Sequence, residues 1–293
     1  MTQDYFKFIN WKENSCRFDS ILALIYFLHQ DDPNIFKSQN KDADLNPILK
    51  LLNENKYTAA QTKFKKFAKA QKHQENSESF GSAVDLLQKI IQFNYEDFNM
   101  IFNEEVSCEN GNCKYKKGKA SRICSILHEY NLENVADHSY GVIQNFFYRH
   151  VINYEFEEDC ACNRKNAKKP FKRITSCQLA TLPKYLIFCL ESFFDQNNEL
   201  RNHLSHIQIE ENIEIEFNNV LNKIELKAIL FYEQMNHFTL AFKNVNFCGN
   251  IYDGWSYYDD KKGNFVRYSL NLDLGKLFSL SFIPLILCYK ISD

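Results

Sequence analysis

Cys16 is the residue of this chain whose type and position best suit nucleophilic chemistry. It stands at the start of the segment 15–29, which has the pattern of a buried helix, and the preceding Ser15 is a good helix N-cap. Unpaired backbone N–H groups and the helix dipole at such an N-terminus favour a thiolate, which lowers the pKa of the thiol and makes the sulfur a nucleophile. On Cys16 alone, a buried and inert cysteine is still the better interpretation.

A thiolate enzyme also needs a base and a group that orients this base. His237 stands at the head of a strand-like segment, HFTLAFKNV, and the later segment GWSYYDD carries Asp259 and Asp260. A strand that begins at His237 and a return strand that ends near Asp259 would form a hairpin-like pair. This pairing would bring the imidazole and a carboxylate side by side.

The chain has 10 cysteines, and their neighbours separate them into classes. No secretory pattern precedes them, so a disulfide framework is not expected, and metal binding, catalysis or burial is favoured instead. Cys189 and Cys288 lie in apolar runs and are predicted to be small core residues. Two closely spaced pairs are candidate metal ligands: Cys108 with Cys113, and Cys160 with Cys162.

Composition and charge exclude several classes of protein. The 293 residues are 45% hydrophobic and 25% charged, as in an ordinary globular protein. The 35 basic and 37 acidic side chains nearly balance, so no global field favours nucleic acid or an acidic lipid surface. No run approaches the roughly 20 apolar residues of a spanning helix, and the N-terminus lacks a signal sequence. We therefore expect an intracellular protein without membrane or nucleic-acid partners.

The elements that must position these residues follow an α+β order. The residue pattern is typical of cysteine-bearing loops between about 105 and 165, and typical of strands from 170 onward. The lysines of the predicted helix at 58–72 favour a solvated helix face over a nucleic-acid patch. Helices are predicted at 15–29, 46–53, 58–72 and 82–94.

Five segments, in this order, resemble the ubiquitin-specific protease (USP) family of papain-like cysteine proteases. NSCRFDS is similar to the family's cysteine box, NHFTLAF to its histidine box GHYxAx, and GWSYYDD to its WYxFDD. LPKYLIFCLESF resembles the LPxVLxxxLxRF strand between these boxes, and PLILCYK resembles the closing YxLFY strand. The resemblance runs from about residue 10 to residue 290.

The resemblance implies one papain-like catalytic domain over 1–293, with an α+β fold in three parts. A helical thumb would cover 10–95, fingers with zinc knuckles would cover 100–170, and an antiparallel β palm would cover 171–293.

The resemblance also implies the catalytic roles. Cys16 would be the nucleophile and His237 the base. Asp259, four residues after Trp255, stands where the family's carboxylate orients the histidine. Because side chains alternate along a strand, Asp259 shares the face of Trp255. Asp260 takes the other face, where it is a candidate to assist the histidine or position water.

The oxyanion hole is where the sequence departs most from the family. The backbone N–H of Cys16 would act with Asn10 or Asn14, because Trp11 stands where the family has its oxyanion Asn. A lost oxyanion donor costs about 10²–10³ in rate. Asp19 stands in place of the Asn of the cysteine box. A box with this Asp and with Trp11 shortly upstream resembles the SUMO-directed branch of the family more than typical ubiquitin proteases.

The cysteine pairs would be the two knuckles of a structural zinc site in the fingers, with four thiolates around the metal. Their spacings, CxxxxC and CxC, depart from the family's CxxC. Cys124, His128 and His138 are therefore alternative candidates for one of the four ligands, and a metal-free module is the alternative to a zinc site.

The predicted function is a thiol-dependent isopeptidase that removes ubiquitin, or a ubiquitin-like modifier such as SUMO, from lysines of proteins. The alternative is a catalytically silent module of the same fold that binds a ubiquitin-like protein or scaffolds a complex. A zinc-finger nucleic-acid protein would explain the cysteine pairs and the lysines, but neither the later strands nor the histidine box.

Overall fold

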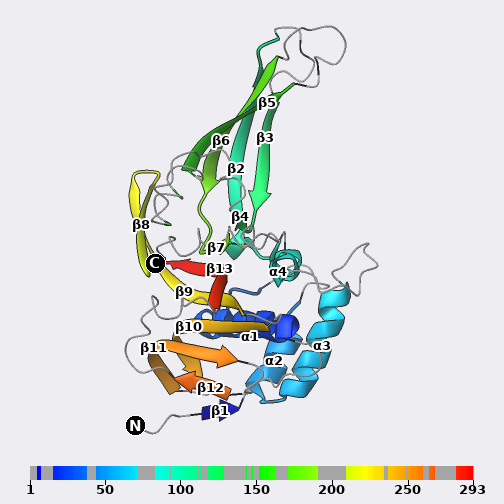
Figure 1. The fold of residues 1–293 in the computed structure, drawn as a ribbon, viewed down its shortest axis with the longest axis vertical. Helices are drawn as coiled ribbons and strands as arrows, with labels where there is room; N and C mark the ends of the chain where they lie inside the picture. The colour runs from blue at the N-terminus through cyan, green and yellow to red at the C-terminus, as the bar shows by residue number, and fades with distance from the viewer. Residues whose placement is uncertain are drawn as a thin grey trace.

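The computed structural model has an α+β fold in which helices pack on a large sheet and a smaller sheet projects from it (Figure 1). The predicted α+β class is confirmed. The structure describes these residues: 5–7, 16–37, 44–70, 83–92, 94–110, 113, 118–128, 143, 147, 152–160, 162, 171–190, 209–233, 237–247, 250–259, 264–267 and 282–292.

Helices α1 to α4 lie within a few residues of the predicted helices, and a short 3₁₀ turn, η2, follows them. Helix α1 is buried on every side from Ile21 to Leu28, as its all-round apolar sequence predicts. The other helices bury one stripe and expose the rest. The bounds are α1 Cys16–Asp31, α2 Asn46–Asn53, α3 Tyr57–Ala70, α4 Ala83–Ile91 and η2 Glu96–Phe98.

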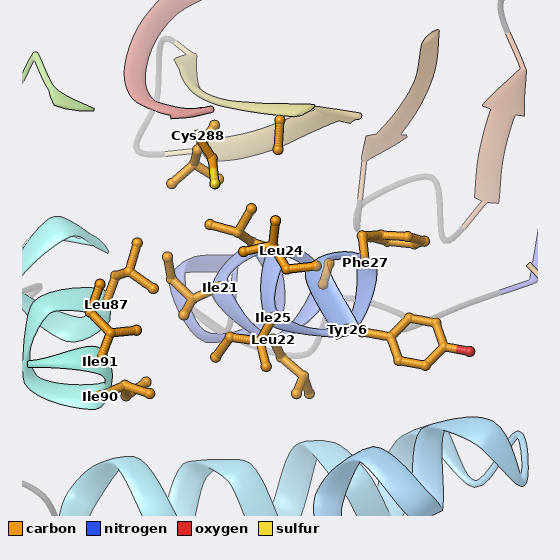
Figure 2. Packing of buried hydrophobic residues seen from close by; sticks show 14 of the residues in the cluster. Ile21, Leu22, Leu24, Ile25, Tyr26, Phe27, Leu87, Ile90, Ile91 and Cys288 are labelled. Carbon is orange, nitrogen blue, oxygen red and sulfur yellow. The ribbon is translucent and has the colours of Figure 1, made fainter. Parts of the chain in front are cut away.

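Helix α1 is enclosed between the large sheet and the other helices (Figure 2). Leu24 and Phe27 point towards the strands, whereas Leu22 and Ile25 point towards the helices. The α1 helix is therefore the central element of the larger hydrophobic cluster. A shift of α1 would open contacts on both sides.

In the described residues the large sheet has the order β1-β12-β11-β10-β9-β13-β7-β4, with β8 also paired to β9. All of its pairs are antiparallel except β4 with β7. The β8–β9 hairpin turns through Asn218 and Asn219, with φ of 52° and 61°, which suits asparagine in a two-residue turn. The bounds are β1 Tyr5–Lys7, β4 Leu127–His128, β7 Tyr185–Cys189, β8 Asn212–Phe217, β9 Val220–Glu233, β10 His237–Phe247, β11 Asn250–Asp259, β12 Asn264–Arg267 and β13 Phe282–Ile291.

The smaller sheet is antiparallel with the order β3-β2-β6-β5, and it forms the elongated projection in Figure 1. Its bounds are β2 Met100–Cys108, β3 Gly118–Cys124, β5 Asn153–Asp159 and β6 Lys172–Thr181. The sequence predicted a loop-rich segment between about 105 and 165, and this is wrong for the strands β3 and β5 and for the end of β2. Most of their described exposed positions are polar or charged and few of their described positions are buried, so they lack the apolar alternation of a core strand.

Strand β6 lies directly after residue 171, where the boundary between fingers and palm remains a prediction. Its sequence is strand-like, as predicted, but it pairs with β2 and β5 of the small sheet and not with the large one. The small sheet therefore extends to Thr181. Among the described helices, none is long and apolar enough to cross a membrane.

Candidate functional site

His237 and Asp259 form a buried pair at one end of the large sheet. The His237 Nε2 atom lies 2.8 Å from the Asp259 Oδ1 atom, and the two residues are only 2% and 5% exposed. A carboxylate is costly to bury without a hydrogen-bond or charge partner. The imidazole N–H therefore stabilises Asp259, and the carboxylate in turn fixes the orientation and tautomer of the ring.

The register of β10 against β11 produces this contact. The two strands are antiparallel with Thr239 opposite Asp259, so His237, two residues before Thr239, is the diagonal neighbour of Asp259 on the same face. Trp255 and Tyr257 share this phase of β11. The predicted pairing of a strand that begins at His237 with one that ends at Asp259 is therefore present.

The contact through Nε2 also determines which ring atom can exchange a proton. With Nε2–H donated to the carboxylate, Nδ1 is the nitrogen that can accept a proton from a nucleophile and return it to a leaving group. A histidine held in this way can serve as a general base. The buried pair thus has the arrangement of a base with its orienting group.

Two contacts along α1 fix the position of its N-terminus. The Ser20 hydroxyl donates to the carbonyl of Phe238 at 3.2 Å, and the Phe27 ring stacks on Phe242 with centroids 3.8 Å apart. Helix α1 therefore runs in the same direction as β10. Cys16, the first residue of α1, lies one turn before Ser20, about 6 Å along the axis. This places the N-terminus of the helix level with His237.

A buried polar contact holds the first turn of α1 against α3. The Gln61 amide donates to the Asp19 carboxylate at 2.9 Å, and both side chains are buried. Asp19 belongs to the segment that resembles the cysteine box, whereas Gln61 was not among the predicted site residues. The signal was available, because Gln61 is a polar residue in the buried stripe that α3 shares with Phe64 and Ala68.

Some of the predicted site residues lie outside the described residues. These are Asn10, Asn14 and Asp260, together with Trp11, and the side chain of Cys16 is likewise not described. Their oxyanion, nucleophilic and assisting roles remain predictions.

The four predicted metal ligands come together at the far end of the small sheet. Their sulfur atoms all lie within 4.8 Å of one another. Two of the contacts cross between the knuckles, with Cys113 Sγ to Cys160 Sγ at 3.5 Å and Cys108 Sγ to Cys162 Sγ at 3.9 Å. Backbone hydrogen bonds from Glu109 to Lys172 and from Cys160 to Phe171 hold the ends of the strands together.

These distances fit a tetrahedral metal ion. With zinc–sulfur bonds of about 2.3 Å, neighbouring sulfurs of a tetrahedron lie about 3.8 Å apart. The four cysteines are free thiols in the structure, and four sulfur ligands suit zinc or an iron–sulfur centre. The cluster could therefore hold a metal ion.

Hydrogen bonds within the cluster separate the acidities of its thiols. The backbone N–H of Cys162 lowers the pKa of the Cys160 thiol to about 7. The hydrogen bond with Cys160 raises the pKa of Cys162 to about 12, and burial raises the pKa of Cys108. Because a metal binds thiolates, its binding would release protons from the last two thiols in particular.

Cys124 does not join this cluster. It pairs with Met100 at the base of β2, whereas Cys108 ends that strand, so the two are about 27 Å apart along it. The Cys124 thiol donates instead to the Ile126 carbonyl at 3.0 Å. The suggestion that Cys124 replaces a knuckle cysteine is wrong for this structure, while His138 and the His128 side chain lie outside the described residues.

Solved structures of similar fold are known, although no family model and no curated protein matches the sequence. The chain is similar to the Saccharomyces cerevisiae PAN2 pseudoubiquitin hydrolase, with a TM-score of 0.60 and 13% identity over 99% of this chain and 86% of that chain. It is also similar to the apo Pan2 pseudoubiquitin hydrolase–RNA exonuclease module from the same organism. That comparison has a TM-score of 0.67 and 12% identity, over 99% of this chain and 55% of that chain.

The chain thus spans about half the length of the two-part Pan2 modules that it matches. At this level of identity the comparison establishes the fold alone. The chain has the USP-like fold that is shared with the Pan2 pseudoubiquitin hydrolase, together with a four-cysteine cluster that could hold a metal ion.

Proposed function

We propose that this protein is a cysteine-dependent isopeptidase that removes ubiquitin or a ubiquitin-like modifier, such as SUMO, from lysines of proteins. The observation that carries the proposal is the buried His237–Asp259 pair at the level of the N-terminus of α1. Packing of the hydrophobic core does not by itself require a buried imidazole and carboxylate at this end of the sheet.

In the proposed reaction Cys16 attacks the carbonyl carbon of the modifier's C-terminal glycine. His237 takes the thiol proton at Nδ1 and later returns it to the lysine amine as this group leaves. Asp259 stabilises the imidazolium and keeps the ring in place. The backbone N–H of Cys16, with Asn10 or Asn14, would bind the oxyanion. Water then hydrolyses the thioester, with His237 as the base.

We further propose that Cys108, Cys113, Cys160 and Cys162 hold a structural zinc ion. Zinc bound by four cysteines has no open position for a substrate, so its contribution is to folding and not to the reaction. The proposal rests on the close approach of the four sulfur atoms.

The experiment is covalent labelling with propargylamide probes of ubiquitin, SUMO and other modifiers, side by side. We expect one adduct, on Cys16, with at least one of these probes. Cys16→Ala should abolish the adduct, whereas the matched control Cys124→Ala should keep it, because Cys124 lies in the small sheet. Undiminished labelling of the Cys16→Ala variant would contradict the nucleophile assignment.

A binding module without catalysis is the second candidate. It is favoured by the similarity to structures that are themselves pseudoubiquitin hydrolases. In this case none of the probes would react with the wild-type protein, while at least one free modifier would bind it in a calorimetric titration. Labelling of Cys16 would exclude this candidate.

A further inference from the structure

We propose that Asn110 is a positioning residue of the four-cysteine site, where it donates N–H hydrogen bonds to one sulfur of each knuckle. The inference rests on the zinc site proposed above and adds a residue outside the cysteine pattern. Asn110 lies between Cys108 and Cys113, in the longer knuckle.

Asn110 contacts three of the four cysteines. Its side-chain Nδ2 lies 3.7 Å from the Cys162 sulfur, across the cluster. Its backbone N–H donates to the sulfur of Cys108, and its carbonyl accepts from the Cys113 backbone N–H at 2.9 Å. One residue therefore shapes the turn of the first knuckle and reaches the second knuckle with its amide.

The negative charge of the thiolates explains why N–H donors are useful at this site. Four thiolates around Zn²⁺ leave a double negative charge on the cluster, and N–H groups aimed at the sulfurs stabilise it. A side-chain amide can donate, whereas a carboxylate of the same shape can only accept. The negative cluster therefore selects Asn over Asp at position 110.

Cys162 is the ligand with the greatest need for such a partner. It is half-buried, while the other three cysteines are buried, and it ends the short CxC knuckle. The hydrogen bond from Asn110 fixes this sulfur from the opposite side of the site. This contact explains how a CxC pair can serve with a CxxxxC pair, since the longer loop supplies the extra support.

The test compares the zinc affinities of the full chain and three variants by competition with a chromophoric chelator. Loss of an outer hydrogen bond to a metal ligand typically weakens metal binding about 10- to 100-fold. We expect about tenfold weaker binding for Asn110→Ala and a larger loss, towards a hundredfold, for Asn110→Asp. Asn103→Asp is the matched control, because Asn103 is exposed on β2 of the same sheet and outside the cluster.

A second readout separates donation from turn formation. Asp forms such turns about as well as Asn, so a role confined to the turn would leave Asn110→Asp with wild-type affinity. The Co²⁺-substituted protein should show thiolate-to-metal charge-transfer bands that shift in Asn110→Asp and not in Asn103→Asp. Equal affinities and unshifted bands in both variants would overturn the role of Asn110. Failure of the wild-type chain to bind either metal would instead overturn the metal site itself.

Discussion

The pairing of His237 with Asp259 requires that the register of β11 against β10 is correct to a single residue. Because side chains alternate on a strand, a one-residue slip of β11 would turn Asp259 towards α1 and bring Tyr258 to the histidine. Tyr258 is in fact packed in the cluster around α1, whereas Trp255 belongs to the cluster on the opposite face. The burial of Tyr258 on one face of β11 and of Trp255 on the other thus fixes the face on which the Asp259 carboxylate lies.

The first prediction concerns this carboxylate. Asp259→Asn should lower kcat of the proposed isopeptidase by about 10⁴, because the amide can favour the wrong tautomer of His237. Asp260→Asn is the matched control and should cost far less, because the residue is out of phase on the strand. Steady-state hydrolysis of a fluorogenic modifier substrate measures both. A greater loss in Asp260→Asn would reverse the assignment.

At the scale of elements, the sequence predicted some parts well. Helix α1 is apolar on nearly every face, and α2 matches the predicted range 46–53. These helices follow local rules of periodicity and capping, which a single sequence contains. The strand that begins at His237 was likewise predictable from its alternating residues.

The small sheet was not predictable in the same way. Its β2 strand, MIFNEEVSC, exposes or half-exposes most of its central residues, so it has almost no hydrophobic signal. Strand β6 looks like any other strand, and only pairing across long sequence distances assigns it to the small sheet. Asn110 and Gln61 were missed because their partners are distant in sequence.

The C-terminus of α1 gives a second prediction, on pH dependence. Asp31 and Asp32 oppose the helix dipole there, and lysines compensate: Lys290 contacts Asp31 at 2.7 Å and Lys184 contacts Asp32 at 2.6 Å. Burial raises the pKa of Asp32. The hydrogen bond and the positive charge of Lys184, together with the hydrogen bond from the Asn34 backbone N–H, lower this pKa by more than burial raises it. The pKa therefore lies below its ordinary value.

A lowered pKa in the folded state stabilises the protein above the unfolded pKa, about 3.9. This contribution is lost as the pH falls through the folded pKa. Asp32→Asn should therefore lower the free energy of unfolding by about 1.5–3 kcal/mol at neutral pH, and the difference from wild type should shrink below about pH 4. Urea unfolding across this pH range measures it.

The control for this prediction is Glu105→Gln, which removes an exposed carboxylate on β2. It should leave the free energy of unfolding within about 0.5 kcal/mol of wild type, as surface substitutions usually do. A deficit in Asp32→Asn that stayed constant down to acid pH would show that ionisation of Asp32 is not its cause.

At the scale of the whole molecule, the apolar contacts are unevenly distributed. One cluster surrounds α1, and a second joins the other face of the large sheet to the base of the small one through Met100, Phe102 and Leu179. At the far end of the small sheet, the cluster formed by described residues consists of the four cysteines. We therefore expect a bound metal to contribute to holding the described ends of these strands together.

The last prediction follows from this distribution. Removal of zinc by a chelator should increase amide hydrogen exchange at the cysteine ends of β2, β5 and β6, because the thiolates no longer share a ligand. Exchange in α1 and β10 should stay unchanged, since the cluster around α1 contains none of the four cysteines. Mass-spectrometric hydrogen exchange with and without chelator measures both regions in one sample.

Cys160→Ser is the matched variant, since it removes one ligand and should reproduce the chelator's effect without any chelator. Cys177→Ser is its control, because Cys177 lies in β6 of the same sheet and outside the cluster. If the cysteine ends held together equally well in the chelated protein, packing and backbone pairing alone would account for the small sheet. If α1 also lost protection, the metal would stabilise the whole molecule and not this one end, and the two parts would unfold as a single unit.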